Sequence, residues 1–209
     1  MTRRTQPLVA DALEQLPERC RRCLFWELGG TRPAEEAAQD VAHEQHVRKQ
    51  AWVASRELED GPPGTVLRQE GRVVGWALHA PARAFAPRAA PVPVADPEAL
   101  LLATAWLHPD VRASGLGRML LQAALRDAIG RDLAAVEAYG DRRAREWDCV
   151  LPATWLLHEG FEVVAEHPRY PLLRLETRRT VRWAASLEHA AHELLGRVAP
   201  RPVPETPTP

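Results

Sequence analysis

The stretch LHPDVRASGLGRMLLQAALRDAIG, residues 107–130, places a short glycine-containing loop directly before an amphipathic segment. Beyond the loop, apolar residues recur at spacings of three and four, which gives a helix one buried face. This stripe consists of Leu116, Met119, Leu120, Ala123, Ala124 and Ala128. The preceding residues, LLLATAWL (100–107), are almost all apolar, as in a strand that is buried on both faces. The sequence therefore predicts a strand, a tight loop and a helix in this order.

The loop has the properties of an anion-binding site. The first turn of a helix leaves backbone N–H groups without partners, and the helix dipole adds partial positive charge there. Gly115 and Gly117 allow the backbone to bend tightly and to approach a ligand closely, because neither has a Cβ atom. Arg112 and Arg118 bracket the turn and offer charge-assisted hydrogen bonds. The pattern predicts a cofactor that carries a phosphate group.

Two common nucleotide motifs do not fit this loop. A P-loop has lysine followed by serine or threonine after its last glycine, whereas Gly117 is followed by Arg118 and Met119. The dinucleotide fingerprint needs a third glycine, and that position is Leu120. A helix start whose glycines only form a turn remains an alternative at this point.

The rest of the chain predicts a single mixed α/β domain. Strands are expected over 65–80 (two, around an EGR turn), over 133–140, and in the runs FEVVAEH and LLRLET. The run CLFWELGG (23–30) also reads as a strand followed by a turn. One or two helices are expected within 33–60, and another in PATWLLHEG, which ends at Gly160. We expect a domain over 1–176, an added amphipathic helix over 177–198 and a disordered proline-rich tail over 199–209.

Composition excludes several classes of protein. The 209 residues carry a formal net charge of −1, which argues against a dedicated nucleic-acid-binding protein. No apolar run approaches the roughly 20 residues of a membrane span, and the start of the chain lacks the apolar core of a signal peptide. Three cysteines, an odd number, suit a reducing compartment, so we expect a cytoplasmic protein. Cys20 and Cys23 could form half of a zinc site, but two semi-buried thiols and no metal are expected.

The segment LHPDVRASGLGRML resembles the acetyl-CoA signature of the GNAT superfamily of acyl-CoA-dependent N-acetyltransferases, in which a strand ending in V-x-P is followed by R/Q-x-x-G-x-G/A. The matching residues are Leu107, Pro109, Arg112, Gly115 and Gly117. RVVGWAL, with Gly75, resembles an earlier strand of that family, and WLLHEGFEVV resembles a later segment through Trp155, Gly160 and Phe161. The resemblance covers roughly residues 65–175. It implies a mixed, largely antiparallel sheet that is splayed at its centre and flanked by helices, an α/β (α+β) fold.

The resemblance also implies a cofactor and its site. Acetyl-CoA would be the acyl donor, with its pantetheine arm bonded like an extra strand to the backbone of Ala105, Trp106 and Leu107. Its pyrophosphate would lie on N–H groups at the helix start. The cofactor-binding residues expected there are Arg112, Ala113, Ser114, Gly115, Leu116, Gly117 and Arg118.

Acyl transfer from a thioester requires a neutral amine, a polarised carbonyl and a thiolate that can leave. The backbone N–H near Leu107 is the candidate for polarising the carbonyl. Where this chain has Leu156, many members of the resembled family have a tyrosine that protonates the leaving sulfur. Tyr139 and Cys149 are the alternative acids, although Tyr139 could instead line the cleft. Glu137 is the candidate base, unless it pairs with an arginine such as Arg142, and Glu27 is a second candidate carboxylate.

We therefore expect acetyl transfer from acetyl-CoA to a primary amine, by direct attack in a ternary complex. The acceptor, a small molecule or a protein, cannot be read from the sequence. The alternative is a catalytically silent module that binds acyl-CoA as a sensor or docking domain. No nucleic acid or membrane partner is expected. The final helix would either cover the sheet or join two chains in a homodimer.

Overall fold

A computed structural model describes residues 2–30, 38–86, 95–112, 114–144 and 149–178. Residues Met1–Thr177 form one compact unit. The described residues end at 178, so nearly all of the expected C-terminal helix (177–198) and the whole proline-rich tail lie outside them.

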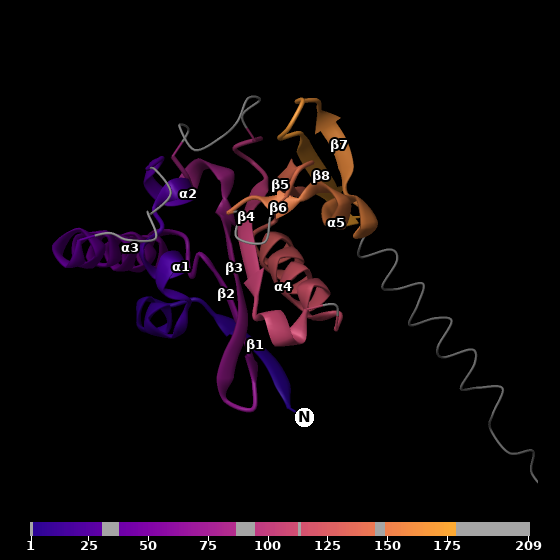
Figure 1. Cartoon of the computed structure of the whole chain (residues 1–209). Coiled ribbons are helices and arrows are strands. Elements are labelled where there is room, and N and C mark those ends of the chain that lie inside the picture. Colours follow the sequence, from indigo (N-terminus) through magenta and orange to yellow (C-terminus); the bar gives the residue numbers. More distant parts are fainter. Residues whose placement is uncertain (1, 31–37, 87–94, 113, 145–148, 179–209) are drawn as a thin grey trace, which may run out of the picture. The chain divides into compact units, whose positions relative to one another are not determined.

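The chain alternates between a sheet and the helices that cover it (Figure 1). Its strands are β1 (Arg3–Pro7), β2 (Gly64–Gln69), β3 (Arg72–Pro81), β4 (Leu100–Leu107), β5 (Ala135–Asp141), β6 (Leu151–Pro152), β7 (Glu162–Ala165) and β8 (Leu172–Glu176). Its helices are α1 (Glu18–Arg22), α2 (Phe25–Leu28), α3 (Gln39–Glu59), α4 (Leu116–Gly130) and α5 (Ala153–His158). Short 3-10 turns are η1 (Ala10–Gln15), η2 (Ala82–Ala84) and η4 (Pro109–Val111).

The described strands form one mixed sheet that opens at its centre. The order is β1-β2-β3-β4-β5-β8-β7, with β6 beside β5. Neighbours on both sides of the centre are antiparallel, whereas β4 and β5 are parallel and pair only at Leu100 with Val136 and at Leu101 with Glu137. Farther along β5, the neighbouring strand is β6 in place of β4, and Gly140 pairs with Leu151. The expected mixed, largely antiparallel and centrally splayed sheet is confirmed.

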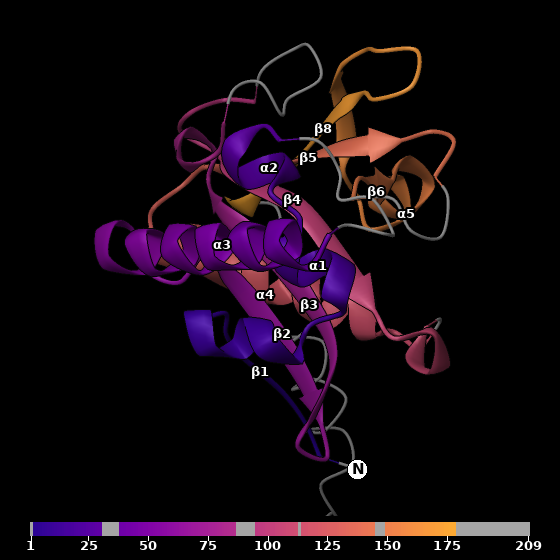
Figure 2. The ribbon, with the colours of Figure 1, turned by 60° about the vertical axis from the view of Figure 1, so that its left-hand side comes forward.

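Helices cover both faces of the sheet, and each face has its own apolar core. Strand side chains alternate between faces, so Leu100 and Leu102 of β4 pack with α4, while Leu101 and Ala103 face the other way. The second core is closed by η1, α2 and Val53 of α3. Figures 1 and 2 show α4 on one side of the strands and α1 and α3 on the other. The strand–loop–helix order predicted from residues 100–130 is confirmed.

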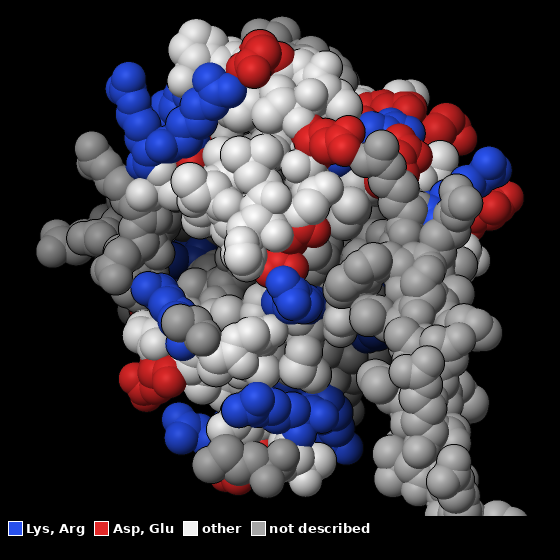
Figure 3. All heavy atoms as spheres, turned by 90° about the vertical axis from the view of Figure 1, so that its right-hand side faces the viewer, with Lys and Arg blue, Asp and Glu red and all other residues white. Residues whose placement is uncertain are grey.

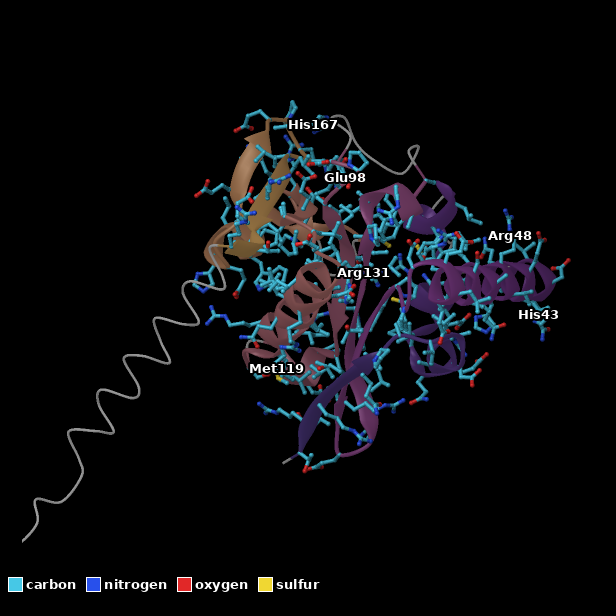
Figure 4. The ribbon with its side chains drawn as sticks, turned by 180° about the vertical axis from the view of Figure 1, so that it is seen from behind. His43, Arg48, Glu98, Met119, Arg131 and His167 are labelled. Carbon is cyan, nitrogen blue, oxygen red and sulfur yellow. The ribbon has the colours of Figure 1, made fainter. Side chains whose placement is uncertain are left out.

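One junction ties α4 to the turn that follows α3. Arg131, just beyond the end of α4, donates through Nε to the carboxylate of Asp127 at 2.7 Å. The same guanidinium donates to the backbone carbonyl of Asp60. Figure 4 shows Arg131 between the end of α4 and α3. The first contact holds the helix end, and the second connects elements that lie on opposite faces of the sheet.

The N-terminal segment differs from the prediction. CLFWELGG does not form a strand: Phe25–Leu28 is the helix α2, and it ends at Gly29, whose φ of 64° is left-handed. A short apolar run does not distinguish a strand from a buried helical turn, and here the helix leaves Trp26 only 2% exposed. Strand β1 was not predicted, because its sequence RRTQP is polar and it lies at the sheet edge with Arg3 and Arg4 exposed.

Gly140 sets how closely α5 can approach the sheet. A Cβ atom at this position would lie 2.8 Å from the Cα of Ala153, which is backbone and cannot move aside freely. We expect Gly140→Ala to lower the free energy of unfolding by about 2 kcal/mol, as overpacked cores do. Urea denaturation measures this, with Gly130→Ala as the control, because nothing lies within 4 Å of a Cβ at Gly130. Equal free energies of unfolding for the two variants would show that α5 can move away from β5 without loss of stability.

Candidate active site

A cavity of about 550 Å³ opens where the sheet is splayed, and we call it the central cavity. One wall is formed by β3, β4 and the loop after β4: Trp76, Leu78, Thr104, Ala105, Trp106, Leu107 and Arg112. The opposite wall comes from the N-terminal helices and α3: Pro17, Glu18, Arg19, Cys20, Cys23, Trp26, Glu27 and Lys49. The segment after β5 adds Ala144, Cys149, Val150 and Pro152. The cavity thus combines an apolar, tryptophan-rich lining with a few charged groups.

The end of β4 has a free backbone edge on the cavity side. The β4–β5 ladder stops at Leu101, and among the described strands none pairs with residues 102–107 on that side. The His108 N–H donates to the Val74 carbonyl of β3 at 2.8 Å. Because successive peptide groups of a strand point to opposite sides, the Leu107 N–H points away from β3, toward the open side. The Leu107 carbonyl accepts a hydrogen bond from Arg112 Nε at 3.3 Å, which fits this orientation.

The glycine loop begins α4 as the sequence predicts. Gly115 is the N-cap residue, with a left-handed φ of 78° that favours glycine. Ser114 Oγ donates to the Val111 carbonyl at 2.5 Å and so closes the turn. Arg118 Nε donates to Glu159 at 2.8 Å, which fixes that arginine beside the helix start. These contacts hold the residues on both sides of the helix start.

The predicted cofactor residues fall into three groups. Ala105, Trp106, Leu107 and Arg112 line the central cavity. Ser114, Gly115, Gly117 and Arg118 lie at the start of α4 beside it, whereas the Leu116 side chain is 1% exposed and packs in the α4 core. Ala113 lies outside the described residues.

A buried ion pair forms part of the opposite wall. Lys49, the only lysine of the chain, donates to Glu27 Oε1 at 2.5 Å and to the Cys23 carbonyl at 2.8 Å. Its ammonium group also lies 5.4 Å from the ring centre of Trp76. Burial acts to lower the pKa of Lys49, but the Glu27 carboxylate, together with Cys23 and Cys20, holds this pKa above its usual value. Lys49 therefore carries a full positive charge. Sequence patterns did not reveal this pair, which joins residues 22 positions apart.

The three cysteines of the chain all line this cavity. Cys23 Sγ lies 3.6 Å from Cys149 Sγ. Burial raises the pKa of Cys20 to about 11. The contact with Cys149, together with burial, raises the pKa of Cys23 as well. Among the described residues, no group of three or more histidine, cysteine, aspartate or glutamate side chains could hold a metal ion. Cys20 and Cys23 are therefore protonated thiols at neutral pH.

Glu137 and Tyr139 lie on β5, outside the set of side chains that line the central cavity. Glu137 accepts hydrogen bonds from Arg174 Nη1 at 2.9 Å and from the Asp96 backbone N–H at 2.8 Å. Its arginine partner is thus Arg174, not Arg142, which pairs with Glu166. Tyr139 is fully buried, and its ring stacks on Trp26 with centroids 5.8 Å apart. Burial raises the pKa of Tyr139 to about 12.

Leu156 supplies no proton donor at the position where the resembled family often has tyrosine. Its side chain is fully buried in the apolar core that packs against α4. Of the two acids considered in its place, Tyr139 is outside the cavity lining and Cys149 is within it.

The fold, the free β4 edge and the glycine turn at the start of α4 define an acyltransferase of the N-acetyltransferase type. The sequence profile of the acetyltransferase (GNAT) family matches residues 26–147, more than half of the chain, so the chain belongs to this family. No protein of curated function matches the sequence.

Solved structures of N-acetyltransferases have the same fold. PaiA N-acetyltransferase from Thermoplasma acidophilum, in complex with coenzyme A, is 14% identical, with a TM-score of 0.55 over 84% of this chain and 99% of that one. YncA of Salmonella typhimurium, a putative acetyltransferase with acetyl-CoA, is 18% identical, with a TM-score of 0.55 over 84% and 94%. An N-acetyltransferase of Staphylococcus aureus is 14% identical, with a TM-score of 0.55 over 85% and 99%. At these identities the likeness concerns the fold.

The surface carries charges of both signs. On the face in Figure 3, arginine side chains form several separate groups with acidic side chains between them. In the part of the chain that the structure describes, no helix is long and apolar enough to cross a membrane.

Proposed function

We propose that the protein transfers the acetyl group of acetyl-CoA to a primary amine, on a small molecule or a protein, by direct attack in a ternary complex. The observation that carries this proposal is the free backbone edge of β4, which leads directly into the glycine turn at the start of α4. The pantetheine arm would pair with the β4 edge at Ala105–Leu107. The pyrophosphate would lie on the N–H groups of the loop from Arg112 to Gly117, with Arg118 beside it.

The Leu107 N–H is the group we propose for polarising the thioester carbonyl. It points to the open side of β4, and a preorganised backbone donor of this kind stabilises the oxyanion that forms during attack. The central cavity reaches this edge from the side opposite α4, so an amine bound there approaches the carbonyl from across the splayed sheet. Orientation of the two substrates supplies much of the rate in such a complex.

Glu27 is the carboxylate best placed to bind the incoming amine and take its proton. It lines the cavity, whereas both carboxylate oxygens of Glu137 already accept hydrogen bonds, one from Arg174 and one from the Asp96 N–H. Lys49 supports this function by holding the Glu27 carboxylate in the cavity wall through their ion pair. Cys149, which lines the cavity, is the candidate donor of a proton to the leaving sulfur.

A pair of variants distinguishes the two carboxylates. Loss of a general base costs roughly 10²–10⁴-fold in rate. We expect Glu27→Gln to lower kcat/KM by at least about 100-fold with acetyl-CoA affinity unchanged, and to lower stability as well, because the buried Lys49 loses its partner. Glu137→Gln should affect stability and leave turnover nearly unchanged. Steady-state kinetics, calorimetric titration with acetyl-CoA and urea denaturation measure the three quantities. A large loss of turnover in Glu137→Gln alone would reassign the base to Glu137.

The proposed activity itself is tested with the full chain, acetyl-CoA and a panel of small amines and peptides. The expected result is an acetylated amine detected by mass spectrometry, together with one CoA released per product. The absence of a tyrosine at Leu156 keeps a second function open, a silent acyl-CoA-binding module. Tight acetyl-CoA binding without turnover of any amine would favour that function.

A further inference from the structure

Two thiols far apart in the sequence meet in the wall of the central cavity. Cys23 lies between α1 and α2, and Cys149 lies just before β6, 126 positions later. Their sulfur atoms are 3.6 Å apart, whereas a disulfide bond is about 2.05 Å long. A small change in side-chain torsion angles and local backbone would bring them to bonding distance.

Buried contacts hold the backbone on both sides of this pair. The Cys23 carbonyl accepts a hydrogen bond from Lys49 Nζ at 2.8 Å. The Cys149 carbonyl accepts one from Trp26 Nε1 at 2.9 Å. Trp26 and Lys49 are themselves 2% and 1% exposed, so both anchors belong to the core. The approach of the two cysteines is therefore a property of the packed structure and not of an exposed loop.

We propose that Cys23 and Cys149 are a redox-sensitive pair, which a low-molecular-weight disulfide converts into an intramolecular disulfide across the wall of the central cavity. Cys149 is half-buried and Cys23 is 7% exposed, so Cys149 meets the reagent first. Its thiolate attacks one sulfur of the reagent RSSR, forming a mixed disulfide and releasing one RSH. The Cys23 thiolate then attacks the sulfur of Cys149 and releases the second RSH. The two cysteine protons end on the two released thiols, and two electrons pass to the reagent.

The Cys149 contact and burial keep the Cys23 thiol protonated at neutral pH, so its attack is slow, and oxidation depends on the reagent entering the cavity. The bond would join the link between α1 and α2 to the segment before β6, which are two different parts of the cavity wall. Cys23, Cys149 and Glu27 line the same cavity, so a shift of these parts changes the space in which the amine would bind. The predicted effect on turnover rests on the proposed function, whereas formation of the bond does not.

The test uses the full chain and 2-hydroxyethyl disulfide, followed by alkylation and trypsin digestion. Trypsin separates the three cysteines, because cleavage after Arg19, Arg21, Arg22 and Arg145 releases each in a different peptide. We expect the intact protein to lose the mass of two hydrogens, and the peptide that begins at Cys23 to be linked to the one that begins at Glu146. A reductant should reverse both changes. Free thiols throughout, or a bond between Cys20 and Cys23, would overturn the proposal.

Variants of single cysteines provide the controls. Cys20→Ser should form the link as the wild type does, and Cys149→Ser should form none. If an amine acceptor is found, oxidation should lower turnover of the wild type on the order of tenfold or more, because small displacements of positioned groups are costly. Cys23→Ser, treated in the same way, should stop at the mixed disulfide on Cys149 and form no peptide link, and a reductant should restore the turnover that each oxidised protein has lost. If no amine is acetylated, the proposed function fails, and the peptide link still decides whether the pair is oxidised.

Discussion

Gly117→Val is expected to weaken acetyl-CoA binding by about 100-fold or more, which corresponds to about 2.8 kcal/mol. Gly117 lies in the first turn of α4, where the exposed N–H groups would hold the pyrophosphate. A branched side chain in this turn would keep a phosphate group from approaching the N–H groups closely. The fold should survive, because the added Cβ lies 3.4 Å from the Trp155 ring, a side chain that can adjust. Titration calorimetry measures the affinity, and circular dichroism checks the fold.

Neighbouring glycines separate the possible causes of this loss. A Cβ at Gly115 meets no protein atom within 4 Å, so Gly115→Val would act on the protein itself through a strained backbone at φ 78°, with a cost on the order of 1–3 kcal/mol. Gly130→Ala, at the other end of the same helix, should bind acetyl-CoA as the wild type does. An unchanged heat of binding in Gly117→Val would show that the diphosphate lies elsewhere.

Lys49→Met is expected to lower the free energy of unfolding by about 3–5 kcal/mol, the usual cost of leaving a buried charge without its partner. The side chains of Lys49 and Glu27 are 2% and 1% exposed, so water cannot replace the lost contact. Folding raises the pKa of Lys49 above its ordinary value of about 10.4. Its contribution is therefore fully present below about pH 10, and is lost as the pH rises through the folded-state pKa.

The adjacent residue provides a matched control for this prediction. Arg48 pairs with Glu44 at 3.8 Å on the exposed side of α3, and these side chains are 56% and 71% exposed. Figure 4 shows Arg48 toward the outer end of the helix. Arg48→Met should change stability by no more than about 1 kcal/mol. The double variant Glu27→Gln, Lys49→Met should recover most of the stability that Lys49→Met loses, because neither buried charge is then left alone. Urea denaturation measures both variants. If Lys49→Met alone is as stable as the wild type, the pair is not desolvated.

The sequence predicted the elements whose patterns are local. Strand β4 is continuously apolar, α4 repeats its apolar residues at helical spacing, and Gly115 marks the helix start. Strand β1 was missed because its polar residues pair only at the sheet edge, and α2 was taken as a strand because four apolar or aromatic positions fit either structure.

The opposite wall of the site depends on contacts between distant positions. Glu27 appeared in the sequence as one of several carboxylates, and nothing indicated that Lys49 would neutralise it. The approach of Cys23 to Cys149 likewise follows from packing of α1, α2 and the segment before β6. Periodicity describes one element at a time, so pairs of this kind become visible only when the layers are assembled.

The burial of the single lysine has a practical consequence. A chain with 27 basic residues, all but one of them arginine, offers an acyl donor no accessible ε-amine of its own. Arginine guanidinium groups remain protonated and do not compete as nucleophiles. Apart from the α-amino group, an acetylated amine on this protein would thus report exposure of Lys49 by unfolding, and an acetylated amine on another molecule would report a true acceptor.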